Sequence, residues 1–208
     1  MFKYTSNSRE HQDLFILSVL DKKSDGVYVE IGAQHFRYGS NTYLLEKDFS
    51  WTGLSVEINK DLCDSFNKNR VNPCVAVDGT AADYEGLFTQ YLLPAHIDFL
   101  QLDIDPYHQT FKALQQIPFE KRSFSIITYE HDAYRGGAKE RLASRELLAS
   151  LGYTLVMRDV MHDDVMFEDW YVNEAYMPND TWKLFLDEKV PMNPGKLTKK
   201  YIDIFNSL

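Results

Sequence analysis

The feature that most constrains this chain is residues 27–59, where two short apolar segments flank a loop of small residues and a helical pattern. The segment 27–31 alternates apolar side chains as a buried strand does, and Gly32 and Ala33 remove bulk where the chain must turn. A second apolar segment follows and stops at Glu57. A carboxylate at the tip of the second strand of a β-α-β unit is well placed to accept both hydroxyls of a ribose. The run therefore predicts a site for a nucleoside-containing cofactor at the carboxyl edge of a parallel sheet.

The composition of the loop narrows the choice of cofactor. A dinucleotide-binding fold uses three spaced glycines so that a pyrophosphate can sit on backbone N–H groups. Residues 32–36 of this chain, GAQHF, do not have that spacing, and a Gly-rich loop ending in Lys-Ser or Lys-Thr is not found either. A cofactor with a ribose but no phosphates fits better, and S-adenosylmethionine is the common one. The competing interpretation is an ordinary α/β crossover that exposes an acid.

Strand and helix patterns alternate along the chain. Helices are predicted over residues 6–20, 40–47, 61–69, 107–116 and 139–150, with a partly helical segment over 81–92. Strands are predicted over 27–31, 54–57, 74–77, 98–102, 124–129, 153–158 and 170–173. This order predicts an α/β fold with a doubly wound, mostly parallel, seven-stranded Rossmann-like sheet. The last two strands have no helix between them, so they predict an antiparallel hairpin at one edge.

Composition excludes several classes of protein. With 208 residues, 44% of them hydrophobic and 14% aromatic, the chain can bury a core of ordinary size. A net charge of −9 argues against a nucleic-acid surface. The sequence has no apolar signal peptide and no stretch of membrane-spanning length. Cys63 and Cys74 are too few for a disulfide framework and are expected to be buried, reduced thiols. We therefore expect a cytoplasmic protein without a membrane or nucleic-acid partner.

Several motifs resemble those of the FkbM-type S-adenosylmethionine-dependent methyltransferases. They are EIGA at 30–33, GSNTYLLE at 39–46 and WTGL at 51–54 followed by Glu57. The likeness continues at 97–114 and 125–132 and covers the chain from about residue 6 to 173. It implies the methyltransferase variant of the doubly wound fold and O-methylation of a small hydroxylated acceptor, such as a sugar or other metabolite. One methyltransferase-like domain is expected over 1–178, with a peripheral tail over 179–208 packed on or near it. A homo-oligomer is left open.

The resemblance also assigns cofactor-binding residues. Gly32 and Ala33 would line the methionine part, Glu57 would hold the ribose, and Asp78-Gly79 would lie near the adenine. Asp103 ends the fourth strand, where a residue close to the transferred methyl is usual. The full expected set is Glu30, Gly32, Ala33, Ser40, Asn41, Thr42, Glu57, Ile58, Asp78, Gly79 and Asp103.

Methyl transfer to a hydroxyl also requires a base. His131 is the best candidate by residue type, because the unperturbed pKa of histidine lies near neutrality. Asp105 is the second candidate and could equally orient the base, and Asp103 completes the expected catalytic group. The alternative for His131 is a hydrogen-bonded loop histidine.

Other chemistries remain open from the sequence. Asp103, Asp105, Glu130 and His131 could together hold Mg²⁺, which prefers carboxylate and water oxygens. Alternatively, Asp103-Ile104-Asp105 could be the acid-x-acid motif of a metal-dependent glycosyltransferase. In a third interpretation Phe36 fills part of the pocket, and the chain is a non-catalytic binding protein on a methyltransferase fold. A proline at position 106 also departs from the family, which tends to have a glycine after the acid.

Overall fold

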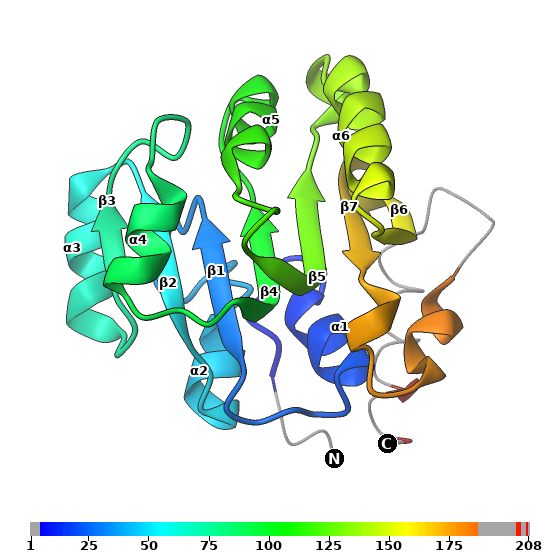
Figure 1. Cartoon of the computed structure of the whole chain (residues 1–208), viewed down its shortest axis with the longest axis horizontal. Coiled ribbons are helices and arrows are strands. Elements are labelled where there is room, and N and C mark those ends of the chain that lie inside the picture. The colour runs from blue at the N-terminus through cyan, green and yellow to red at the C-terminus, as the bar shows by residue number, and fades with distance from the viewer. Residues whose placement is uncertain (1–4, 187–202, 205–206, 208) are drawn as a thin grey trace.

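A computed structural model describes residues 5–186, 203–204 and 207 of the chain. Seven strands form one sheet in the order β3-β2-β1-β4-β5-β7-β6 (Figure 1). The strands are β1 (Val27–Ile31), β2 (Thr52–Glu57), β3 (Cys74–Ala76), β4 (His96–Leu102), β5 (Ser123–Glu130), β6 (Thr154–His162) and β7 (Val165–Val172). The first five pair in parallel, whereas β7 runs antiparallel to both β5 and β6. The doubly wound fold with an antiparallel edge hairpin is therefore confirmed.

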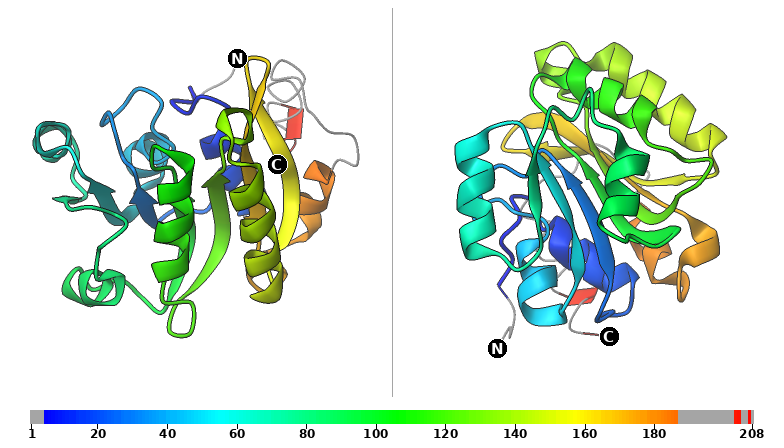
Figure 2. Two further views of the ribbon diagram at one scale, coloured as in Figure 1. Left: turned by 90° about the horizontal axis from the view of Figure 1, so that it is seen from above. Right: turned by 60° about the vertical axis from the view of Figure 1, so that its left-hand side comes forward.

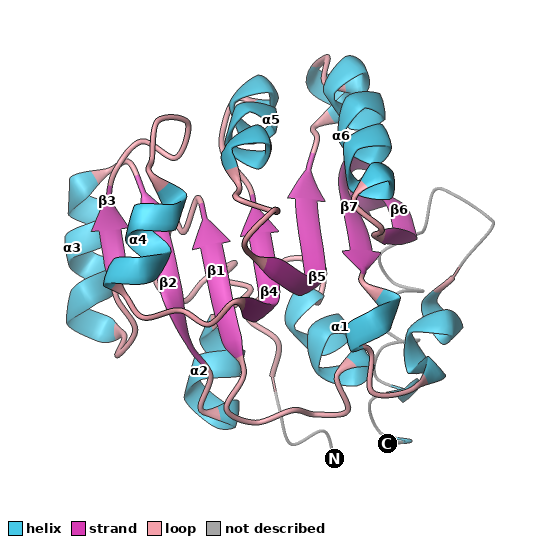
Figure 3. Cartoon of the chain, in the orientation of Figure 1, coloured by secondary structure: helices cyan, strands magenta, loops and turns pink. Residues whose placement is uncertain are grey.

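In the described part of the chain, six α-helices cover the two faces of this sheet (Figures 2 and 3). They are α1 (Gln12–Val19), α2 (Tyr43–Phe49), α3 (Lys60–Asn69), α4 (Tyr84–Gln90), α5 (Tyr107–Gln116) and α6 (Ala138–Ser150), with short 3₁₀ helices η1 (Ala133–Arg135), η2 (Glu174–Tyr176) and η3 (Asp180–Phe185). Helices α1, α2 and α3 lie on one face, and α4, α5 and α6 lie on the other. Among the described residues, no helix combines the length and apolar character needed to cross a membrane.

The alternation of side chains along the central strands explains the two layers. Val29 and Ile31 of β1 belong to the core under α4 and α5, whereas Tyr28 points to the core under α1 and α2. Both faces of a parallel sheet are covered, so strands of this kind are apolar on both sides. Residues 97–102 of strand β4 are all buried, and all but Asp98 and Gln101 are apolar.

The winding of the chain reverses between β1 and β4. The chain moves outward from β1 through β2 to β3 and then returns to pair β4 with the other side of β1. The backbone N–H of Gly32 donates to Val56 O at 2.9 Å, and that of Asp103 donates to Ile31 O at 3.0 Å. Ligands of doubly wound sheets bind beyond the carboxyl ends of the strands at such a reversal.

The first helix is shorter than predicted. It begins at Gln12 instead of Ser6, because Asp13 draws the preceding segment into polar contacts. The Asp13 carboxylate accepts from Ser6 Oγ at 2.7 Å and from the Asn7 N–H at 2.9 Å. His11 then turns the chain into the helix with a left-handed φ of 62°.

The edge hairpin is longer than predicted. Strands β6 and β7 extend toward a tight turn at residues 163–164, through positions whose polar side chains suggested a loop. Asp159 and Asp169 are buried there because Arg145 of α6 donates to both carboxylates at 2.8 Å. A strand can contain such acids when a neighbouring helix supplies their counter-charge.

The described start of the predicted tail, residues 179–186, packs on the domain. Trp182 and Phe185 of η3 are buried in the core beside α1, and the rings of Phe15 and Phe185 meet edge to face at 5.0 Å. Residues 187–202, 205–206 and 208 of the predicted tail lie outside the described residues. The expected thiols, Cys63 and Cys74, are both buried and free.

Candidate functional site

A cavity of about 400 Å³ lies beyond the carboxyl ends of β1, β2, β3 and β4. Seven of the predicted site residues line it: Gly32, Glu57, Ile58, Asp78, Gly79, Asp103 and Asp105. They come from the ends of four strands that are far apart in the sequence, and the parallel sheet brings them to one rim. Neighbours that the sequence analysis did not select also line the cavity: Gln34, Asn59, Leu62, Val77, Thr80, Ile104 and Gln109.

Gly32 allows the ends of β1 and β4 to approach each other. Its φ is +90°, a conformation that L side chains rarely adopt, and a Cβ at this position would lie 1.7 Å from Asp103 O. No larger residue fits without moving the backbone. The glycine thus lets β1 and β4 lie close together at the floor of the cavity.

Glu57 presents a fixed carboxylate to the cavity. Its two oxygens accept from the backbone N–H groups of Gln34 and Asn59, each at 2.8 Å. Each carboxylate oxygen has a further lone pair, so both can accept another hydrogen bond. The side chain is 7% exposed, and its position is therefore set before any ligand arrives.

The loops after β3 and β4 form the other walls. Ile58 has 67% of its surface exposed and lines the cavity together with Ile104, which lies close to Gly79. Asp78 is exposed, and its carboxylate accepts from both the N–H and the hydroxyl of Thr80 at 2.8 Å. These two bonds hold the pKa of Asp78 below its ordinary value. The cavity thus combines apolar walls with a few oriented oxygens, as small-molecule sites do.

A second, smaller cleft of about 30 Å³ adjoins the large cavity. Gly32, Gln34 and Asp103 line both spaces. The predicted residues Glu30, Ala33, Ser40 and Asn41 line the small cleft, as does Glu130, whereas Thr42 lines neither space and donates to Glu30 at 3.0 Å. Glu30 is buried, which raises its pKa, and it accepts a second bond from Ser55 at 2.8 Å.

Two buried oxygens of the small cleft lack partners. Asn41 Oδ1 and Gln101 Oε1 accept no hydrogen bond from any described residue. Both residues are only 4% exposed. Leaving a buried acceptor unsatisfied costs about 1–3 kcal/mol, so both oxygens favour a bound group that donates. Gln101 has a detectable sequence signal, since it is a lone amide within the apolar strand segment 99–102.

Asp103 stands where the two spaces meet. It is half-buried, and burial, reinforced by the nearby charge of Asp105, raises its pKa to about 7. Asp105 itself is exposed and pairs with Arg135 Nη1 at 2.9 Å. At neutral pH the carboxyl of Asp103 can therefore both bind and release a proton, which is the property of a general base.

His131 does not lie at the site. Its side chain is fully buried and lines neither cavity, although it follows β5 as predicted. Its Nδ1 accepts from the Ala133 N–H at 3.1 Å, and its Nε2 lies 3.6 Å from oxygens of Asp159 and Asp169. The position beside β7 keeps the imidazole away from any ligand of the cavity. The structure thus places His131 outside the candidate site, and its role as the base stays a prediction.

The predicted Mg²⁺ site is not supported. In the described part of the chain, the one group of three His, Cys, Asp or Glu side chains with close ligand atoms is His131, Asp159 and Asp169. Its carboxylates already pair with Arg145, and a further guanidinium donates to Asp159 Oδ1. These arginine charges disfavour a metal ion there. A separate ion pair weakens the acid-x-acid interpretation, because the carboxylate of Asp105 already pairs with Arg135.

Phe36 turns away from the cavity. Its ring is partly buried against the small cluster that contains Ala33 and Phe66, and it stacks on His35 at a centroid distance of 4.4 Å. It lines neither the large cavity nor the small cleft. The Phe36 ring, whose bulk suggested a blocked pocket, therefore does not fill the pocket.

Comparison with solved structures identifies the class of fold. An O-methyltransferase from Bacillus cereus, solved in complex with SAH, matches with a TM-score of 0.55 and 14% identity over 80% of this chain and 82% of that one. A putative rRNA methylase from Clostridium thermocellum matches with a TM-score of 0.54 and 12% identity over 81% and 97%. The N-methyltransferase NodS from Bradyrhizobium japonicum matches with a TM-score of 0.50 and 12% identity over 79% and 95%. The chain has the Rossmann-like methyltransferase fold.

No family model matches the sequence, and no curated protein matches it either. Identities of 12–14% show the fold alone.

Proposed function

We propose that this chain is an S-adenosylmethionine-dependent methyltransferase that methylates a hydroxyl of a small, polyhydroxylated acceptor. The observation that carries the proposal is the fixed carboxylate of Glu57 in a 400 Å³ cavity at the reversal of the sheet. The motif resemblance to the FkbM-type enzymes supports the choice of a hydroxyl acceptor. We further propose a cytoplasmic setting, which suits the two free thiols.

The residues of the large cavity fit an adenosine. Glu57 would accept from the ribose hydroxyls, and Ile58 and Ile104 would pack on the flat faces of the adenine. Asp78 would accept from the exocyclic amine. The volume is in the range of sites for small molecules. Each of these roles uses a group that already faces the cavity.

The charge of the large cavity favours a cofactor without phosphates. Among the described residues that line it, none is a lysine or arginine, whereas Glu57, Asp78, Asp103 and Asp105 are acids. Phosphate groups are normally met by cations or by a helix N-terminus. A dinucleotide or a nucleotide sugar would therefore be repelled here, which also speaks against a glycosyltransferase.

The small cleft suits the methionyl end of the cofactor. Ala33, Ser40 and Asn41 line it, and the unsatisfied Asn41 oxygen calls for a donor such as an ammonium group. Arg9 lies at the same cleft and offers a charge for a carboxylate. We propose that the cofactor spans both spaces and passes over Gly32.

When bound, S-adenosylmethionine would supply an electrophilic methyl group on a sulfonium. The protein then has to orient the acceptor and remove its proton, and orientation alone supplies much of the acceleration. Asp103 lines both spaces and has a pKa of about 7, so we assign it as the base in place of His131. The surrounding acids, Asp105 and Glu130, favour an acceptor that is neutral or positively charged.

A ligand panel tests the proposal. Calorimetry with S-adenosylhomocysteine, NAD and a uridine diphosphate sugar with Mn²⁺ should give binding for the first ligand alone. Incubation with S-adenosylmethionine should then release S-adenosylhomocysteine with neutral sugars and not with their phosphate esters. Binding of the nucleotide sugar without binding of S-adenosylhomocysteine would refute the methyltransferase assignment.

A further inference from the structure

The loop between β1 and α2 contributes to both proposed ligand spaces but has little regular structure. Its two ends are tied to the sheet, because the Gln34 N–H donates to Glu57 of β2 at 2.8 Å and Thr42 donates to Glu30 of β1 at 3.0 Å. Between these ends, His35 Nδ1 accepts from the N–H groups of Arg37 and Tyr38, each at 3.1 Å, and Gly39 forms an isolated bridge with Ser8. These contacts shape the middle of the loop but do not attach it to the sheet. A binding loop needs an external support to hold its shape before the ligand arrives.

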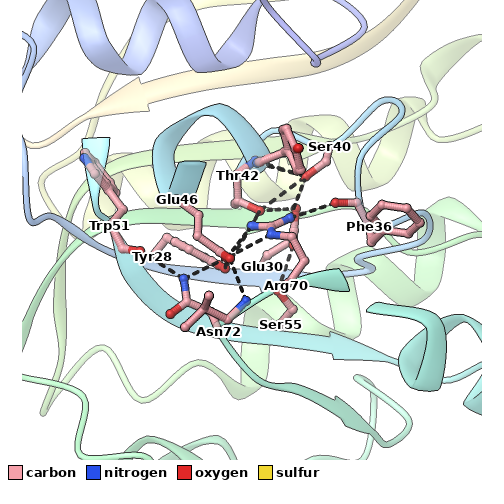
Figure 4. Close-up of polar contacts among 12 residues, drawn as sticks. Tyr28, Glu30, Phe36, Ser40, Thr42, Glu46, Trp51, Ser55, Arg70 and Asn72 are labelled. Atoms are coloured by element: carbon pink, nitrogen blue, oxygen red, sulfur yellow. Dashed lines mark hydrogen bonds and ion pairs between the residues drawn. The ribbon is translucent and has the colours of Figure 1, made fainter. Parts of the chain in front are cut away.

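Arg70 supplies this support from the end of α3. Its guanidinium reaches the loop at three points (Figure 4). Nη1 donates to Phe36 O at 3.0 Å and to Ser40 Oγ at 3.4 Å, and Nη2 donates to Thr42 Oγ1 at 3.2 Å. Ser40 in turn accepts from the Tyr43 N–H at 3.1 Å, at the first residue of α2. One side chain therefore spans the second half of the loop.

The other contacts of Arg70 fix it to rigid elements. Nη2 also donates to the hydroxyl of Tyr28 in β1 at 3.2 Å, and Nε donates to Glu46 in α2 at 2.8 Å. Glu46 is held in its turn by Asn72 at 2.9 Å. The Arg70 side chain is only 1% exposed, so water does not compete for these bonds.

The arrangement requires an arginine. A guanidinium has five N–H donors in a planar fork, and Arg70 has five acceptors placed around it. A lysine at this position keeps the charge but offers three donors from a single point. It can satisfy the carboxylate of Glu46 but not the loop contacts at the same time.

We propose that Arg70 is a positioning residue that holds residues 36–42 in the conformation that the cofactor needs. Arg70 lines neither the large cavity nor the small cleft, so it acts on a ligand only through the loop. The inference rests on the proposed function, because it takes the ligand of that loop to be S-adenosylmethionine.

The test compares Arg70→Lys with a matched control, Arg122→Lys. Arg122 is also a largely buried arginine: it binds Glu85 through two nitrogens at 3.0 Å and donates to Leu93 O at 2.8 Å, away from both cavities. We expect Arg70→Lys to weaken S-adenosylhomocysteine binding at least tenfold and to speed amide hydrogen exchange in residues 36–42. Arg122→Lys should leave affinity within twofold of wild type and the exchange of this loop unchanged.

A purely structural role gives a different result. If Arg70→Lys lowers the melting temperature but keeps wild-type affinity and wild-type exchange in residues 36–42, the proposal is overturned. If this variant does not fold, Glu46→Gln provides the same comparison, because it removes the charge that holds the guanidinium. Unchanged affinity and loop exchange in Glu46→Gln would then overturn the proposal. Failure of wild type to bind S-adenosylhomocysteine would refute the proposed function instead, and the exchange data would still report on the loop.

Discussion

Replacing Gly32 by alanine should be unusually costly, and the structure separates the two reasons. The residue has a left-handed φ of +90°, and its added Cβ would lie 1.7 Å from Asp103 O. The backbone strain of a non-glycine residue in this region is about 1–2 kcal/mol. Relief of an overlap with backbone adds about 1–3 kcal/mol, as in overpacked cores. We therefore expect Gly32→Ala to lower the free energy of unfolding by about 2–5 kcal/mol.

Gly152→Ala isolates the strain. Gly152 also has a left-handed φ, +86°, but no atom lies within 4 Å of a Cβ added there. This control should cost about 1–2 kcal/mol, since only the backbone conformation is penalised. The difference between the two variants measures the contact between the ends of β1 and β4.

Urea unfolding followed by circular dichroism measures both losses. With a slope of about 2 kcal/mol per molar urea, Gly32→Ala should lower the midpoint by about 1–2.5 M. Gly152→Ala should lower it by less than about 1 M. If the two midpoints fall equally, the close approach of Gly32 to Asp103 does not exist in solution, and the argument for the cavity floor is wrong.

Three further changes test single groups. Asp103→Asn should slow methyl transfer about 100- to 10,000-fold, and the wild-type rate should rise with pH toward a plateau above about 7, where Asp103 is ionised. Wild type should lose stability as the pH rises from 4.5 to about 8, because burial raises the pKa of Glu168 from 4.5 to about 8 and the unfolded chain ionises this carboxyl first. Glu168→Gln should abolish this loss, which urea midpoints measure. Ile58→Ala should weaken nucleoside binding about 3- to 10-fold by calorimetry without changing the melting temperature, since Ile58 is 67% exposed.

The sequence was informative where a local pattern decides the structure. Strand β1 and helix α5 have the predicted bounds, because apolar alternation in the first and helical spacing before Pro118 in the second leave little choice. Strand ends in a parallel sheet necessarily share an edge, so Glu57 and Asp78 could be placed at one rim without any knowledge of contacts.

Long-range pairing explains where the structure departs from what the sequence suggested. His131 follows a strand end like the acids that line the cavity, but Asp169 from the antiparallel strand β7 lies beside it and the ring is buried. Likewise, the polar side chain of Asp159 suggested a loop, since its counter-charge, Arg145, is 14 residues away on α6 and gives no local signal. Arg70 carried no local signal, since its acceptors come from residues 28–46 and meet only in the fold.

Calorimetry with S-adenosylhomocysteine on wild type and Glu57→Ala, with and without Mg²⁺, tests the central claim most directly. We predict micromolar binding by wild type, no dependence on Mg²⁺, and a loss of about 100-fold in Glu57→Ala, since the hydrogen bonds of a charged acceptor to two hydroxyls are removed. The melting temperature of the variant reports on folding independently. Absence of binding by wild type, or equal binding by a folded Glu57→Ala, would contradict the assignment of this cavity to the cofactor.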